Sequence, residues 1–208
     1  MSMLLAAWTL PKELPSFWKM VALIATNNLT HYLMFAGGAW LLGYVLFRNW
    51  WASRKIIPAM PNGADLRREA KWSALTVVIY GLVGATTLTL AKAGGTFIYR
   101  NVEDYGWGWF WGSVIVMIFV HDAYVYWTHR LIHHPRLFRL IHGVHHESHN
   151  PSPWAAYCFS PIEAVIQAGI FPFVALTMPI HPLAFGLFML WSITFNVAGH
   201  TGYEFHPR

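Results

Sequence analysis

The stretch from Ser73 to Ala91 contains no charged residue and is long enough to cross a lipid bilayer. A spanning helix needs about 20 mostly apolar residues to cross roughly 30 Å of hydrocarbon. The composition agrees, because 56% of the 208 residues are hydrophobic and only 11% are charged, whereas a soluble domain carries about 25% charged residues. These numbers exclude a disordered chain, and the single cysteine excludes an intrachain disulfide framework. We therefore expect an all-α fold, a polytopic membrane helical bundle.

Four further apolar stretches extend this bundle. Two are expected to cross the membrane singly, although the first of them has an interfacial helix as its alternative: Tyr32–Phe47, extendable back to Asn28, and Trp107–Val120, continuing to Trp127. The other two are joined by a very short proline-containing link and are expected to form a tight helical hairpin: Ile162–Met178 and Pro182–Ala198. Residues 1–15 form a short, weakly amphipathic lead-in, and we expect it to be interfacial.

The distribution of basic residues predicts the orientation of the chain. Between the first two spans, six basic residues oppose only Asp65 and Glu69: Arg48, Arg54, Lys55, Arg67, Arg68 and Lys71. The positive-inside rule places this loop in the cytoplasm. The third span then ends on the cytoplasmic side and delivers the following histidine-rich segment there. The formal net charge of +5 is a mild excess, so no nucleic-acid partner is expected.

Eight of the twelve histidines fall between His121 and His149. His129 and His133 are spaced i, i+4, which places both imidazoles on one helical face. His142, His145 and His146 again share one face through their i+3 and i+4 spacings. Imidazole is a ligand for zinc, copper, iron and nickel, whereas magnesium and calcium prefer oxygen. The pattern therefore predicts a histidine-rich metal site that caps the bundle on its cytoplasmic side.

The remaining histidines have simpler interpretations. His31 and His181 are expected to be ordinary polar residues, and His134 is expected to face solvent. His149 continues the face of His142, and it could be a ligand, a supporting group or a substrate-facing residue. His121 is rotated away from the face of His129 and is not assigned to the site.

Two acidic residues are candidates for supporting the metal ligands. Asp122 shares a helical face with Tyr126, His129 and His133, and a carboxylate at membrane depth is costly and marks a functional site. Because metal-binding histidines commonly donate their second N–H to a carboxylate, we assign Asp122 tentatively to the catalytic site as a supporting group; the alternative is an ion pair with Arg130. Glu163 follows Ser160 by three residues, which is a capping box at a helix start. Supporting a histidine is the alternative role of Glu163.

The histidine-containing motifs together resemble the fatty acid hydroxylase (sterol desaturase) superfamily. They are His121–His133 (HDAYVYWTHRLIH), Leu137–Ser148 (LFRLIHGVHHES), Ser160–Glu163 (SPIE) and Asn196–Gly202 (NVAGHTG). The similarity runs from about Val116 to His206. It divides the chain into an N-terminal membrane region, residues 1–115, and a fatty acid hydroxylase-like region, residues 116–208.

The resemblance implies an integral membrane enzyme with two non-haem Fe ions held by histidines. Such enzymes use O2 and two external electrons to hydroxylate or desaturate a lipid. The metal ligands carried over from the family are His129, His133, His142, His145, His146 and His200. No flavin, nicotinamide or CxxC iron–sulfur motif occurs in the sequence, so a separate electron-transfer protein is expected to act as partner, beside the lipid bilayer and the lipid substrate. Hydroxylation and desaturation both stay open, as do sterol, fatty acyl, sphingolipid and carotenoid substrates, and a bacterial inner membrane or an endoplasmic reticulum location.

The sequence departs from the family pattern at its end. The family carries a further HxxHH box some tens of residues beyond the position of His200, and no second HxxHH occurs here. The expected explanation is a C-terminally truncated chain; a divergent member with an incomplete site is the other. Two other functions are therefore kept: a non-catalytic membrane metal-binding protein of the same fold, and a b-type cytochrome with haem between facing spans.

Overall fold

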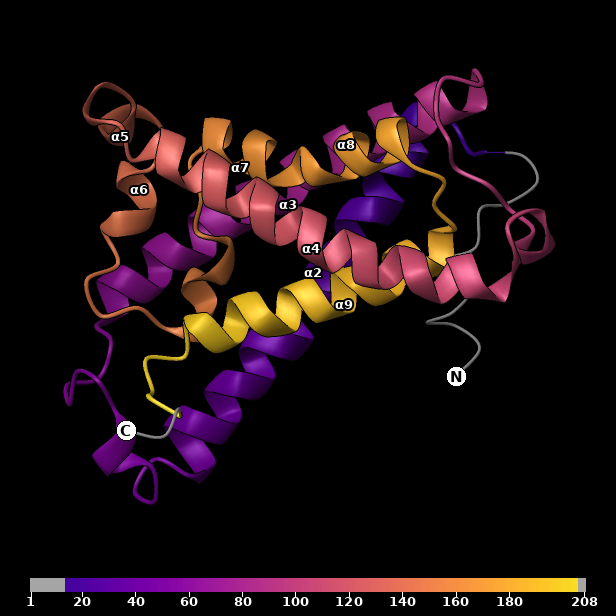
Figure 1. Ribbon diagram of the computed structural model, residues 1–208. Helices are drawn as coiled ribbons and strands as arrows, with labels where there is room; N and C mark the ends of the chain where they lie inside the picture. The colour runs from indigo at the N-terminus through magenta and orange to yellow at the C-terminus, as the bar shows by residue number, and fades with distance from the viewer. Residues whose placement is uncertain (1–13, 206–208) are drawn as a thin grey trace.

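A computed structural model describes residues 14–205 and shows helices joined by short connections (Figure 1). Most of the predicted interfacial lead-in, and His206, lie outside the described residues. No strand occurs within residues 14–205, where only two isolated bridges form, so the predicted all-α fold is confirmed. The helices are α2 (Phe17–Trp40) with its π-helical continuation η1 (Leu41–Leu46), η2 (Ala52–Arg54), α3 (Gly63–Lys92), η3 (Val102–Asp104), α4 (Gly106–Ile132), α5 (Pro135–Ile141), α6 (Gly143–His146), η4 (Pro153–Tyr157), α7 (Pro161–Ala168), α8 (Ile170–Thr177) and α9 (Pro182–Gly199).

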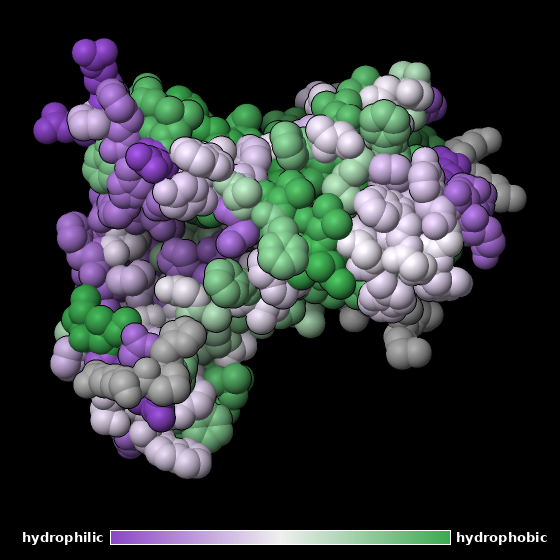
Figure 2. All heavy atoms as spheres, in the orientation of Figure 1, coloured by the Kyte–Doolittle hydropathy of each residue, from purple (hydrophilic) through white to green (hydrophobic). Residues whose placement is uncertain are grey.

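Four of these helices are long and apolar enough to cross a membrane. They are α2 with η1, α3, α4 and α9, while α7 and α8 form a shorter apolar stretch. The spans predicted around Ser73–Ala91 and Trp107–Trp127 are therefore present as helices. The first span is longer than predicted, because residues 17–31 continue the helix toward the N-terminus. Figure 2 shows hydrophobic residues across the middle of the molecule and hydrophilic residues gathered around the end that carries α5 and α6.

The predicted tight hairpin of α7–α8 and α9 is only partly correct. The two arms meet near their turn, where the rings of Phe171 and Phe185 lie 4.5 Å apart. Toward the other end the arms separate, with α7 and α9 on opposite sides of α4 in Figure 1. α8 and the first half of α9 share one buried core cluster with α4, whereas a cavity lies between the other parts of the two arms.

The α2–α3 pair forms a close crossing on one side of the bundle. Gly81 of α3 allows it, because a Cβ at this position would lie 2.8 Å from the Val21 carbonyl oxygen. Small residues at such crossings let two helix backbones approach closely in a membrane. Beside this crossing, Tyr32, Tyr157 and Ile193 pack into one buried core cluster, which joins α2 to η4 and α9.

The basic loop and the histidine-rich segment lie at the same end of the molecule. The loop pairs with residues after α9, since the Glu204 N–H donates to the Arg54 carbonyl oxygen at 2.8 Å. It also contacts the residues after α6, because the Asn150 side chain donates to the Ala59 carbonyl oxygen at 2.9 Å. The histidines are thus at the end of the molecule that carries the positive charge used to predict orientation.

Candidate metal centre

Six histidines from three parts of the chain meet at the end of the bundle. α4 supplies His129 and is followed by its C-cap His133, His142 lies between α5 and α6, α6 supplies His145 and His146, and His200 follows α9. Their ring centroids form a connected series, with 4.6 Å between His129 and His133, 4.8 Å between His133 and His142, 4.6 Å between His142 and His146, 5.2 Å between His142 and His145, and 5.1 Å between His145 and His200. The structure therefore brings together all six residues that the sequence motifs single out.

The first opposed pair in this cluster is His129 and His133. Their Nε2 atoms lie 3.0 Å apart, as expected for one helical turn with both rings on the same face. His142 completes a group of three whose ligand atoms all lie within 4.8 Å of one another. Two nitrogens bound to one ion at about 2.1 Å are about 3.0 to 3.4 Å apart for ordinary bond angles. The spacing of this pair fits two ligands of one ion.

The second opposed pair is His145 and His200, whose Nε2 atoms lie 3.2 Å apart. The Nδ1 atom of each ring faces a backbone carbonyl, that of Cys158 at 3.2 Å and that of Asn196 at 2.7 Å. A carbonyl only accepts hydrogen bonds, so each Nδ1 carries the proton and each neutral ring has a lone pair on Nε2. Burial lowers the pKa of His145 to about 3 and also lowers the pKa of His200, which keeps both rings neutral. Two lone pairs facing each other repel, and a cation between them removes the repulsion.

His142 is oriented by a carboxylate. Its Nδ1 lies 2.7 Å from Oε1 of Glu163, and the two side chains are almost completely buried. Its Nε2 is buried without a hydrogen-bond partner among the described residues. Burial raises the pKa of Glu163 and lowers that of His142, so this environment disfavours their ionised forms unless another charge compensates. A cation at Nε2 supplies that charge and satisfies the orphan nitrogen, so the residues present fit a bound metal.

The sequence motif at α7 explains how Glu163 reaches this position. Ser160 precedes α7 and accepts a hydrogen bond from the Glu163 backbone N–H, as an N-cap residue does. The Ser160 hydroxyl itself donates to the Ile141 carbonyl oxygen, which ties α7 to α5 next to His142. Glu163 therefore takes part in the cap through its backbone and supports a histidine through its side chain. The contact with a histidine, which the sequence gave as the alternative role of Glu163, is therefore present, whereas the reciprocal side-chain bond of a capping box is not found among the described residues.

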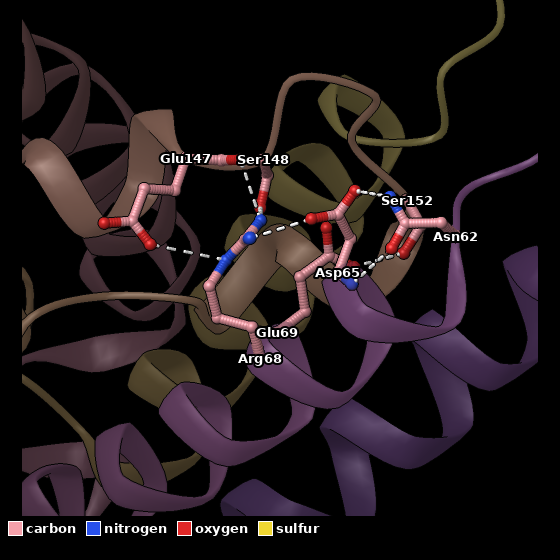
Figure 3. Close-up of polar contacts among 7 residues, drawn as sticks. All are labelled: Asn62, Asp65, Arg68, Glu69, Glu147, Ser148 and Ser152. Atoms are coloured by element: carbon pink, nitrogen blue, oxygen red, sulfur yellow. Dashed lines mark hydrogen bonds and ion pairs between the residues drawn. The ribbon is translucent and has the colours of Figure 1, made fainter.

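A polar network fixes the residues that follow His146 (Figure 3). Arg68 of α3 donates to the Glu147 carbonyl oxygen at 2.8 Å and to the Ser148 hydroxyl at 3.3 Å, and it pairs with Asp65 at 2.7 Å. The next residue of α3, the fully buried Glu69, accepts a hydrogen bond from the Ser152 hydroxyl at 2.6 Å. Thus α3 holds the segment 147–152 at both of its ends.

A cavity of about 770 Å³ leads from the histidines into the apolar bundle. Four histidines of the cluster line one part of it, namely His129, His142, His145 and His200, together with Glu163. The rest of its wall comes mainly from α2, α3, α4, α7, α8 and α9, with Leu88, Phe171 and Met189 among its apolar residues. This volume is within the range of pockets that enclose most of a small ligand, about 300 to 1,000 Å³.

The other predicted residues lie as follows. Asp122 is exposed and lines the cavity; within residues 14–205 no hydrogen bond joins it to an imidazole. Seven residues of helix separate it from His129 by about 10.5 Å of rise, so its supporting role stays a prediction. His134 and His149 are exposed, and His134 caps α5. His121, which the sequence left unassigned, lines the cavity and has Ser192 of α9 as its neighbour at 3.4 Å, a contact between two helices that spacing within α4 does not indicate.

Comparisons with known proteins identify a family and several relatives that this chain resembles. The Fatty acid hydroxylase family matches residues 114–208. The chain is 35% identical over 109 residues to the Delta(7)-sterol 5(6)-desaturase erg3C of Aspergillus fumigatus, covering 52% of this chain and 33% of that protein. It is 28% identical over 185 residues to the lathosterol oxidase of Rattus norvegicus, covering 85% of this chain and 60% of that protein. The chain thus spans between a third and three fifths of the length of these relatives. No solved structure matches the chain significantly.

Proposed function

We propose that this chain, whose residues 114–208 belong to the fatty acid hydroxylase and sterol desaturase superfamily, is a membrane-bound, O2-dependent di-iron oxidoreductase that hydroxylates or desaturates a lipid. The observation that carries the proposal is the presence of two separate opposed pairs of imidazole nitrogens, His129 with His133 and His145 with His200. Each pair has the spacing of two ligands on one ion. His142, whose Nε2 is directed into the cluster without another partner, and His146 complete the proposed ligand set.

The residues of this chain would have three tasks. Glu163 and the carbonyls of Cys158 and Asn196 hold a proton on Nδ1 of their histidines, which leaves Nε2 free to bind metal and increases its basicity. The iron, when bound, would supply the activation of O2 needed to attack an unactivated C–H bond. The cavity would accept the lipid from the bilayer and bring one of its carbons to the histidines, and its apolar wall would exclude water from that carbon.

The orientation and the electron supply belong to the same proposal. The basic loop and the histidines lie at one end of the molecule, so the positive-inside rule would place the site on the cytoplasmic side. A soluble or membrane-bound electron carrier could then approach it. We expect no sustained turnover with a reduced nicotinamide alone; turnover should require an added carrier, and sustained turnover without one would contradict this part of the proposal.

The ion count tests the metal site directly. The chain is purified in detergent, loaded anaerobically with Fe(II), freed of excess metal, and assayed for bound iron per chain by elemental analysis. We expect two ions in the unaltered chain. His129→Ala with His133→Ala, and separately His145→Ala with His200→Ala, should each remove at least one. The matched control, His134→Asn with His149→Ala, changes two exposed histidines and keeps a capping acceptor before α5, so it should retain both ions.

The possible outcomes separate the proposals. One ion per chain without oxygen consumption in the presence of a lipid and a carrier favours the non-catalytic metal-binding protein. No bound iron in material that keeps its helical content and elutes as a single species excludes the oxidoreductase. Loss of iron from the control pair would show that the measured metal is bound nonspecifically by surface imidazoles.

A further inference from the structure

A second set of polar residues lines the cavity, apart from the histidine cluster. It consists of His121 and Asp122 on α4, Gln167 on α7 and Ser192 on α9, which we call the polar girdle. Polar side chains within membrane-spanning helices are costly, and they mark functional sites by default. Within residues 14–205 no hydrogen bond joins these four side chains to the histidine cluster, and only Asp122 has a predicted role there, so the girdle requires its own explanation.

Three observations place the girdle in one part of the cavity. His121 Nε2 and the Ser192 hydroxyl lie 3.4 Å apart. Each is eight residues before a histidine of the cluster, His129 or His200, so both helices put these two residues about 12 Å from that cluster. On the third wall, Tyr124 donates to the Ile166 carbonyl oxygen at 2.7 Å, and this bond places the neighbouring Gln167 next to α4, about one helical turn nearer the histidines than His121.

On the side of the girdle away from the histidines, α8 and α9 line the cavity with apolar residues. Continuing along α9 away from His200, the lining residues are Met189, Phe185 and Pro182, and α8 adds Ile170 and Phe171. Three asparagines also line the cavity, Asn27, Asn28 and Asn196; of these, Asn28 and Asn196 donate to backbone carbonyls. A ligand would therefore find hydrogen-bonding groups at the girdle and apolar side chains of α8 and α9 further in.

The charge of the girdle restricts the ligand. Within residues 14–205 no lysine or arginine lines the cavity, whereas the girdle contains the carboxylate of Asp122. A lipid carboxylate at this level would meet a like charge and no cation, which is unfavourable. An imidazole next to a serine hydroxyl can both donate and accept, and this combination matches a neutral hydroxyl group.

We infer that the cavity binds a neutral lipid alcohol whose hydroxyl is held by His121 and Ser192, about 12 Å from the histidine cluster. If the proposed function holds, the carbon that is oxidised lies about 12 Å from the hydroxyl of the lipid. This part of the inference rests on the proposed function. The binding of the alcohol itself does not depend on the metal. The polar girdle would thus determine which class of lipid enters and how far it is inserted.

Binding of three probes tests this inference on the full chain in detergent. The probes are hexadecan-1-ol, hexadecane and hexadecanoate, each competing against tritiated hexadecan-1-ol, with metal-free and iron-loaded protein measured in parallel. The variants are Ser192→Ala and His121→Phe, the latter chosen because it keeps an aromatic ring against Phe188 and Trp191. The matched control is Thr194→Val on the same helix, whose hydroxyl bonds its own backbone at an exposed position.

We expect each girdle variant to weaken hexadecan-1-ol binding about fivefold to tenfold, the effect of one lost hydrogen bond, and to leave hexadecane binding unchanged. Thr194→Val should alter neither, and hexadecanoate should bind the unaltered chain more weakly than the alcohol. The inference is overturned if alcohol binding survives both girdle variants, if alcohol and alkane binding fall together, or if hexadecanoate binds more tightly. Failure of iron loading with the alcohol preference intact would contradict only the proposed function.

Discussion

The Nε2 atoms of His145 and His200 lie 3.2 Å apart, although 55 residues separate the two histidines in the sequence. The Nδ1–H of each ring donates to a backbone carbonyl oxygen, that of Cys158 for His145 and that of Asn196 for His200. The backbone therefore selects the tautomer of both rings before any metal arrives. This preorganisation is what a site needs if its ligands come from separate helices, because it avoids reorientation of the rings on binding.

Substitution of Glu163 should weaken metal binding through His142. Glu163→Gln retains most of the side-chain shape but loses the negative charge opposite Nδ1 of His142. Since groups that orient metal ligands typically contribute a factor of about 10 to 100 in metal affinity, we expect a decrease of that size in competition with a chelator. Glu103→Gln, at an exposed position between α3 and α4, is the control and should leave the affinity unchanged. Equal metal affinities for the two variants would show that Glu163 does not support metal binding.

Loss of Arg68 should loosen the segment that follows the histidines. Arg68→Ala removes the hydrogen bonds to the Glu147 carbonyl and the Ser148 hydroxyl. We expect the backbone amides of residues 147–152 to exchange hydrogen about tenfold faster, because local opening no longer breaks these bonds. The neighbouring Arg67 is exposed, and Arg67→Ala should not change the exchange. Hydrogen–deuterium exchange with mass spectrometry measures both, and unchanged rates in Arg68→Ala would show that Glu69 and Ser152 hold the segment alone.

Much of the fold and of the site could be predicted from the sequence. The length of an apolar stretch such as Ser73–Ala91 is enough to predict a membrane-spanning helix. A segment that crosses hydrocarbon must form all its backbone hydrogen bonds internally, and a helix does so. The shared face of His129 and His133 follows from their helical spacing, and so does the shared face of His142 and His146. These features are local, and local patterns are directly readable in a sequence.

The features that the sequence did not settle depend on long-range contacts. The opening between α7–α8 and α9 arises because each arm packs on the long helices, which hydropathy does not reveal. The role of Glu163 was ambiguous, since a capping box accounts for the same residues as a buried bond to His142. His121 was set aside because its angle was compared only with the face of His129, while its neighbour Ser192 comes from another helix.

The cap of α7 should contribute to stability and to the position of Glu163. Ser160→Ala removes the bond to the Glu163 N–H and the bond to the Ile141 carbonyl, and loss of an N-cap typically costs about 0.5 to 2 kcal/mol. Ser16 precedes α2 but makes no side-chain capping bond, so Ser16→Ala is a matched control and should be nearly neutral. Unfolding titrations with sodium dodecyl sulfate in mixed micelles compare the two. A Ser160→Ala chain as stable as Ser16→Ala would mean that these bonds are replaced by water.

The close crossing of α2 and α3 should respond strongly to one methyl group. Gly81→Ala would place its Cβ 2.8 Å from the Val21 carbonyl oxygen and 3.1 Å from the Ala25 Cβ, so the two helices must move apart. Overpacking of this kind costs about 1 to 3 kcal/mol. Gly38 of α2 would meet nothing within 4 Å, and Gly38→Ala should instead stabilise the helix by about 0.5 to 1 kcal/mol. The same unfolding titration measures both changes, and destabilisation of equal size in the two variants would contradict the crossing geometry.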